Sequence, residues 1–291
     1  MRESLLQLYP AAYRTAHGQE IVDVHRELTE GLPRAARLRA DADLVAHALR
    51  VRLRLDSASP AGRLFVLAAP FALAVGAVNS GIHLMTWYTG IALSPGSVWS
   101  HLSTTDGMWA LHVLLLAMVC VGAIIALSGR WALGAGLAVG GLLGIAVQWT
   151  IAAPQYGEGA FEPVAAVLTA FVVLACPPDR RGDRRLAAAA GAMAAVAWFP
   201  VALIDTRAFV VSTEYGAWPL LVLAATGAVL ALHGRSSGLR EMGAMALASP
   251  LFLAYAYTSG WLELPPVLAI GVALALPILA GLTAAYHRLW Q

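Results

Sequence analysis

The apolar run MWALHVLLLAMVCVGAIIAL, residues 108–127, decides the fold class of this chain. It contains no acidic or basic side chain apart from a single histidine. About 20 apolar residues are long enough to cross the hydrocarbon core of a bilayer as a helix. The whole chain agrees with this, because 59% of its 291 residues are hydrophobic and 12% are charged, whereas soluble domains contain about 25% charged residues. The composition therefore predicts a protein whose main solvent is lipid.

Similar runs recur along the chain and predict an all-α fold, a polytopic membrane helix bundle of about eight transmembrane helices. The runs are Phe65–Trp87, Met108–Leu127, Trp131–Ala152, Pro163–Cys176, Leu186–Ile204, Gly216–Leu232, Met242–Gly260 and Val267–Tyr286. The fourth and the sixth are short, so six or seven spans are the alternatives if a weak run is re-entrant. Prolines inside the runs remove backbone donors and predict kinks; they are Pro70, Pro200, Pro250 and Pro277.

Arginine predicts the orientation of the bundle, because cytoplasmic loops collect positively charged residues. With the N terminus inside, the outer connections contain Arg207 alone. The inner connections and the tail contain Arg130, Arg180, Arg181, Arg184, Arg185, Arg235, Arg240 and Arg288. An inverted topology would place nearly all of these arginines outside, so we expect both chain ends on the inner side.

Three glycines at four-residue spacing, Gly136, Gly140 and Gly144, predict a smooth stripe along the third run. Membrane helices use such stripes for close backbone approach. Packing within the bundle is favoured over a dimer seam, because such stripes are common inside bundles, and the oligomeric state stays open.

Residues 1–60 are polar and predict a small cytoplasmic helical domain in front of the transmembrane bundle at 61–291. Pro10 suits the first turn of a helix, and Gly18 predicts a turn with positive φ, followed by a helix over 19–30. A second amphipathic segment, 41–55, precedes the first apolar run and ends in arginines that suit anionic lipid headgroups.

The segment LYPAAYRTAHGQEIVDVHREL, residues 8–28, resembles the Leu-Tyr-Pro…Arg…Gly-x-Glu segment that opens many actinobacterial and acidobacterial membrane proteins. It is similar to the short cytoplasmic prefix domain found before some permease subunits, and to segments of membrane proteins encoded beside PadR-type regulators. His17 and Gln19 depart from the pattern, where Tyr and an acid are common. The matching positions are Leu8, Tyr9, Pro10, Arg14, Gly18 and Glu20.

This resemblance implies a small contact domain in a bacterial protein of the cytoplasmic (inner) membrane, with both termini cytoplasmic. It does not imply transport, because the apolar runs resemble no permease core. The candidate partner-binding residues are Tyr9, Pro10, Tyr13, Arg14, Gly18 and Glu20. The alternative is that this domain only covers the inner ends of the bundle.

Polar side chains inside the runs predict an outward-opening ligand pocket, because facing lipid would leave them unsatisfied. The candidates are Asn79, His83, His112, Gln148, Asp205 and Tyr255. Rim positions are His101, Asp106, Glu158, Glu162 and Glu214. The alternative is structural, with each histidine satisfied by one interhelical hydrogen bond.

The sequence assigns no catalytic residue and predicts no cofactor, metal or nucleic-acid site. His101 and His112 are too far apart for the paired spacing of zinc ligands, and no nucleophile elbow, P-loop or dinucleotide fingerprint occurs. The charged turn at 179–185 is too short for nucleic-acid binding and suits lipid headgroups.

These features of the sequence lead to two hypotheses about the function of the chain. The first is a membrane protein of signalling or accessory type, whose N-terminal helical domain contacts a cytoplasmic partner or the inner membrane face. The alternative is an integral membrane enzyme that acts on a lipid-soluble substrate in the outward-facing pocket.

Overall fold

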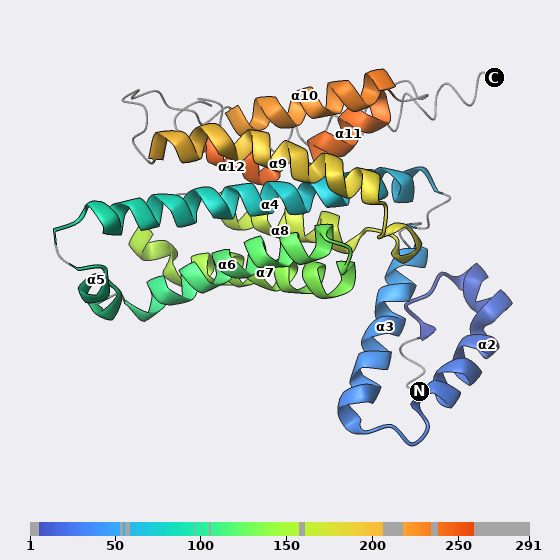
Figure 1. Cartoon of the computed structure of the whole chain (residues 1–291). Helices are drawn as coiled ribbons and strands as arrows, with labels where there is room; N and C mark the ends of the chain where they lie inside the picture. Colours follow the sequence, from blue (N-terminus) through green and yellow to red (C-terminus); the bar gives the residue numbers. More distant parts are fainter. Residues whose placement is uncertain are drawn as a thin grey trace. The chain divides into compact units, whose positions relative to one another are not determined.

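The computed structural model describes residues 6–52, 55, 59–95, 97–104, 106–156, 161–205, 218–233 and 238–258. Every regular element in these residues is a helix (Figure 1). Three helical stretches are long and apolar enough to cross a membrane: Pro60–Leu93, Gly107–Leu127 and Trp131–Ile151. The all-α prediction is confirmed for the described residues, and the chain has the helices of a membrane-embedded protein.

The chain forms two compact units, Met1–Arg63 and Leu64–Gln291. The first contains α2 (Ala11–Thr29) and α3 (Arg34–Arg52). The turn predicted at Gly18 is wrong, because α2 runs through this residue without interruption. A glycine in a helix interior costs only about 1 kcal/mol relative to alanine, and the flanking residues favour the helix. The left-handed glycine is Gly31, with φ of 73°, where it lets the chain turn after α2.

The second unit is a helix bundle, and α4 begins a few residues before the boundary. Its elements are α4 (Pro60–Leu93), α5 (Val98–Thr104), α6 (Gly107–Leu127), α7 (Trp131–Tyr156), α8 (Phe161–Leu174), the short 3₁₀ helix η1 (Pro178–Arg180), α9 (Arg184–Asp205), α10 (Trp218–His233), α11 (Leu239–Ala248) and α12 (Pro250–Thr258). The predicted eighth run, Val267–Tyr286, lies outside the described residues.

Proline has different effects in different helices. α4 and α9 continue through Pro70 and Pro200. The seventh predicted run is instead two helices, because the chain breaks at Ser249 and Pro250 begins α12. Proline has no N–H and suits the first turn of a new helix. Both the backbone N–H and the hydroxyl of Ser249 donate to the Ala246 carbonyl, at 3.3 and 2.8 Å, and so end α11.

Glycines bring α6 and α7 into backbone contact. A Cβ at Gly122 would lie 2.7 Å from the Gly134 carbonyl oxygen, and a Cβ at Gly134 would lie 2.5 Å from the Gly122 carbonyl oxygen. Further along, a Cβ at Gly141 would lie 2.7 Å from the Leu115 carbonyl oxygen. These positions leave no room for a side chain, so α6 and α7 form a tight antiparallel pair (Figure 1).

The predicted glycine stripe coincides with this contact only in part. Gly144 lies against Leu115, but a Cβ at Gly136 would meet nothing within 4 Å, and at Gly140 only Met118 at 3.7 Å. The prediction of packing inside the described bundle is therefore wrong for Gly136. With 3.6 residues per turn, positions 134 and 141 share the face toward α6, whereas 136 and 140 lie on another face.

Contacts of α4 with α6 and with α9 fix the direction in which α4 presents its polar side chains. Gly76 lies near Val119 of α6, and Gly81 lies near the indole of Trp198 on α9. The Cys120 thiol donates to the Ala77 carbonyl at 3.5 Å and also joins α6 to α4. Beside these contacts, α4 brings Asn79, Ser80 and His83 toward α6 and α8.

Candidate functional site

A small polar cavity lies among α4, α6 and α8. Its polar lining consists of Asn79, Ser80 and His83 from α4, His112 from α6 and Glu162 from α8. Apolar side chains close it, namely Leu116, Leu142, Ile145, Ala166, Leu251 and Ala254. The cavity volume is about 30 Å³, and one water needs about 10–15 Å³ on this measure. The cavity therefore has room for about two water molecules.

A hydrogen-bond chain orients His112. The Gln148 side-chain amide donates to the Met108 carbonyl at 2.6 Å, and its oxygen lies 3.0 Å from His112 Nδ1. An amide oxygen only accepts, so His112 Nδ1 carries a hydrogen and donates it. In a neutral imidazole Nε2 is then an acceptor. Gln148 is only 7% exposed and thus serves to hold His112 in one orientation.

His83 and Glu162 form the second polar pair. His83 Nε2 lies 4.0 Å from Glu162 Oε1, and both side chains are half-buried. This distance exceeds that of a direct hydrogen bond and suits an ion pair or a bridging water. Glu162 is also in the first turn of α8, where the helix macrodipole stabilises a negative charge.

The structure brings four of the six predicted pocket residues together. Asn79, His83 and His112 line the cavity, and Gln148 holds His112. Tyr255 is half-buried against the apolar core and does not line the cavity. Asp205 ends α9, and its side chain lies outside the described residues.

The residues predicted at the rim of the pocket lie in different parts of the structure. Glu162 lines the cavity itself. Asp106 instead caps α6, where its carboxylate accepts from the Met108 N–H at 3.2 Å, and His101 lies in α5. Glu158 and Glu214 lie outside the described residues. Sequence reasoning missed Ser80, although its three-residue spacing from His83 places both on one helix face.

The part of the chain that the structure describes contains no set of side chains that could bind a metal ion. No group of three or more His, Cys, Asp or Glu side chains is placed to hold an ion there. Cys120 and Cys176 are both free thiols.

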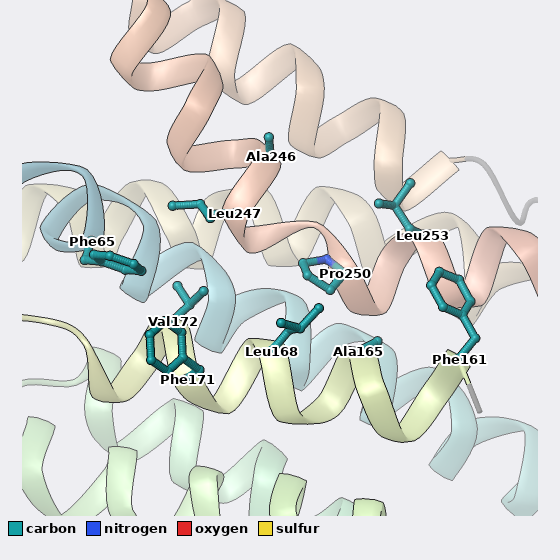
Figure 2. A pocket seen from close by; sticks show the side chains of 10 residues that line it. All are labelled: Phe65, Phe161, Ala165, Leu168, Phe171, Val172, Ala246, Leu247, Pro250 and Leu253. Carbon is teal, nitrogen blue, oxygen red and sulfur yellow. The ribbon is translucent and has the colours of Figure 1, made fainter. Parts of the chain in front are cut away.

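A separate apolar pocket of about 110 Å³ lies where α11 gives way to α12, beside α4 and α8 (Figure 2). Its walls are Phe65, Phe161, Ala165, Leu168, Phe171, Val172, Ala246, Leu247, Pro250 and Leu253. The rings of Phe65 and Phe171 meet edge to face with centroids 5.9 Å apart. All the described side chains that line this pocket are apolar, so they offer only apolar contact.

The first unit contains an open groove of about 590 Å³ between α2 and α3. Its lining residues are Tyr9, Tyr13, His17, Glu20, Ile21, Val24, His25, Leu28, Ala40, Asp43, Leu44 and His47. Successive turns of α2 contribute positions 13, 17, 20, 24 and 28, and those of α3 contribute 40, 43 and 47, so each helix contributes one face. Val24 and Leu28 are 48% and 65% exposed. The groove therefore presents apolar side chains that the unit itself leaves uncovered.

Tyr9 anchors one end of this groove. It is 1% exposed, and its ring stacks on Tyr13 with centroids 5.5 Å apart. Its hydroxyl lies 2.8 Å from His47 Nδ1 and 3.4 Å from the Leu44 carbonyl oxygen, which links the start of α2 to α3. Desolvation raises the pKa of Tyr9, and the neighbouring Tyr13 raises it further, while Arg50 acts in the opposite direction.

A second link joins the helices further along. His25 is 7% exposed, and its Nε2 lies 2.8 Å from Asp41 Oδ1.

Beside Tyr9, desolvation lowers the pKa of His47, and the Arg50 guanidinium lowers it further. Both causes favour the neutral imidazole of His47 in its contact with the Tyr9 hydroxyl.

Three of the six predicted partner-binding residues line the groove, namely Tyr9, Tyr13 and Glu20. The other three belong to the same segment without lining it. They are Pro10 before α2, Arg14 and Gly18. Sequence reasoning missed the α3 wall, because no local signal shows which face of a second helix a first helix meets.

Comparisons with models of known protein families, with curated proteins and with solved structures found no match for this chain. Its class therefore follows from the helices themselves: an all-helical chain with long apolar helices suited to a membrane.

Proposed function

We propose that this chain is an integral membrane protein of signalling or accessory type, whose N-terminal helical unit binds a cytoplasmic protein partner. The groove between α2 and α3 carries this proposal, since it leaves Val24 and Leu28 exposed in a concave apolar surface. The resemblance of residues 8–28 to a permease prefix domain supports the same role for the unit.

An amphipathic helix is the partner that this groove fits best. Two helices already present apolar positions at helical spacing, and a third helix laid between them would bury both rows. Among the described side chains, the charged groove residues are Glu20 and Asp43, and none of the lining residues is an arginine. Charge complementarity therefore favours a partner helix with Arg or Lys beside its apolar face, and disfavours anionic lipid headgroups in the groove.

Crosslinking at Val24 tests this proposal in the intact chain. A photoreactive residue at position 24 should give one discrete adduct in living cells, because the side chain lies in the groove. The adducted peptide should have an apolar helical face flanked by basic residues. A synthetic copy of that peptide should bind the full chain in nanodiscs, and Leu28→Glu should weaken binding at least about tenfold by burying an unpaired charge.

Leu38 supplies the matched control. It is 62% exposed on α3, close to the value for Leu28, but it lies outside the groove. A photoreactive residue at position 38 should give no such adduct, and Leu38→Glu should leave peptide binding unchanged. Equal adducts at positions 24 and 38, or equal effects of the two glutamates, would contradict binding in the groove.

We also propose that the bundle has about eight spans in the bacterial cytoplasmic membrane, with both termini in the cytoplasm. The arginine distribution supports this orientation. On this proposal the turn before α9 is cytoplasmic, and the segment between α4 and α5 faces outward.

Cysteine labelling tests that orientation. Gly182→Cys, in the turn before α9, should resist a membrane-impermeant maleimide in intact cells and react after lysis. Ser97→Cys, between α4 and α5, should react in intact cells. The unsubstituted chain, which has Cys120 and Cys176, measures the background. The reverse labelling pattern would overturn the topology.

The enzyme alternative receives no support from the size of the polar cavity. A space of about 30 Å³ accepts water, whereas ligand pockets are usually about 300–1,000 Å³. The size of this cavity therefore argues for the signalling or accessory proposal over an enzyme that acts on a lipid-soluble substrate there.

A further inference from the structure

We propose that the partner helix is held by one arginine, whose guanidinium lies against a row of aromatic rings in the groove between α2 and α3 and pairs with Glu20 and Asp43. This inference rests on the proposed function, because it names the side chain by which the same groove recognises its helix. The groove has three features that fit such an arginine: the rings, a carboxylate on each wall, and exposed apolar side chains beside them.

The rings form a continuous row at one end of the groove. On α2 the Tyr13 ring stacks on that of Tyr9 with centroids 5.5 Å apart, and the His17 ring lies 4.9 Å from Tyr13. On α3 the His47 ring lies 5.6 Å from Tyr9 and 6.3 Å from Tyr13. The His17 side chain, last in the row on α2, is 50% exposed. A planar guanidinium, which stacks well on rings, can therefore reach it from the open side of the groove.

The two carboxylates follow the rings, one on each helix. Glu20 is one turn after His17, and its Oε2 lies 3.5 Å from His17 Nδ1. Glu20 is nine residues before the end of α2, and Asp43 is nine residues after the start of α3, so both lie at a similar distance from the turn that joins the helices. Both are exposed and line the groove. A guanidinium has N–H donors on more than one side, so one arginine can pair with both carboxylates.

A cation is less favourable at the opposite end of the ring row. Arg50 follows His47 by three residues in α3, and its positive charge acts on both Tyr9 and His47. A guanidinium there would meet a like charge, whereas near Glu20 and Asp43 it meets opposite charge.

The apolar part of the groove predicts where this arginine lies in the partner's sequence. Val24 and Leu28 are four and eight residues after Glu20, which is about 6 and 12 Å along α2. On a partner helix that lies beside α2, the arginine is therefore three or four positions from the side chain that contacts Val24. It is seven or eight positions from the one that contacts Leu28.

The test begins with the intact chain that carries the photoreactive residue at position 24. Glu20→Gln combined with Asp43→Asn should lower the adduct yield in cells at least about fivefold, because both charges that face the guanidinium are lost. Glu27→Gln combined with Glu30→Gln is the matched control. It removes the same number of charges from exposed positions of the first unit outside the groove, and it should leave the yield unchanged.

The outcomes separate this inference from the proposed function. If the chain without these substitutions gives no discrete adduct, the proposed function fails and the arginine anchor fails with it. If the adduct forms but the yield survives Glu20→Gln and Asp43→Asn, only the arginine anchor is overturned. An adduct with a lipid instead of a peptide would also overturn it.

The adducted peptide then identifies the side chain. It should contain an arginine three or four positions from the crosslinked residue, and its absence would overturn the inference. A synthetic copy with lysine at that position should bind the full chain in nanodiscs about threefold more weakly, because an ammonium neither stacks flat nor presents a planar fork of donors. His17→Leu should remove most of this difference, since it takes away the exposed ring. Equal binding of the arginine and lysine peptides would overturn recognition of a guanidinium.

A double-mutant cycle locates the contact. Glutamine in place of that arginine should weaken binding of the peptide at least about tenfold in the unsubstituted chain. In the chain with Glu20→Gln and Asp43→Asn the same change should have a much smaller effect, because the interaction has already been removed. Additive losses would show that the arginine pairs elsewhere and would overturn the inference.

Discussion

Gly134→Ala should destabilise the bundle by about 1–3 kcal/mol or more. This is the usual cost of forcing an additional side chain into a well-packed contact. The new Cβ would overlap the backbone nitrogen of Ala126 and lie 2.5 Å from the Gly122 carbonyl oxygen. Both obstacles are backbone atoms, so no rotamer change relieves the overlap and α6 must move away from α7. Unfolding of the purified chain by SDS, followed by circular dichroism, measures the loss of stability.

Gly136→Ala is the control on the same helix. A Cβ at Gly136 meets nothing within 4 Å, so the substitution should leave stability unchanged or raise it by up to about 1 kcal/mol through helix propensity. Gly122→Ala combined with Gly134→Ala should cost less than the sum of the single substitutions, because both separate the same two backbones. Equal destabilisation by Gly134→Ala and Gly136→Ala would show that the helices do not meet at Gly134.

Tyr9→Ala opens the N-terminal unit, with an expected cost of about 3–5 kcal/mol for a fully buried aromatic ring. Tyr9 is 1% exposed and joins the start of α2 to His47 and Leu44 on α3. Hydrogen exchange of the intact chain, measured by mass spectrometry, should show faster exchange in both α2 and α3 and little change in α6 and α7. Such a pattern is expected because local units open separately from the rest of a chain.

Tyr9→Phe separates the ring from its hydroxyl. It keeps the stacking on Tyr13 and removes the contacts to His47 and Leu44, so its cost should be only about 1 kcal/mol. If Tyr9→Phe accelerates exchange as much as Tyr9→Ala, the hydroxyl rather than the buried ring holds the unit together. If neither substitution changes exchange, Tyr9 is not an anchor of the unit.

Local patterns were sufficient for the helical class and for part of the polar cluster. The run at 108–127 is apolar on every face, and that alone predicts a membrane helix wherever its neighbours lie. Asn79 and His83 are four residues apart, so any helix places them on one face. The avoidance of lipid by polar groups then predicted that they would meet His112 and Gln148, and the structure brings these four together.

The faces that helices present to each other could not be derived in this way. Gly136 and Gly140 looked like a packing stripe, but the contact with α6 lies at Gly134 and Gly141. All four are glycines in one helix, and only the position of the partner helix distinguishes them. Similarly, nothing in the sequence showed that Pro250 would break its helix while Pro70 and Pro200 would not.

The sequence by itself determined that this chain is helical and suited to lipid, and it predicted a polar cluster that includes Asn79, His83, His112 and Gln148, because hydropathy and helical spacing are properties of short segments. Only the tertiary structure decided that the polar cluster encloses a space of about 30 Å³ with Glu162 among its walls, and that Val24 and Leu28 lie uncovered in a groove. Cavity size and exposure depend on how closely residues far apart in the chain approach one another. That distance results from the packing of whole helices, which no short segment specifies.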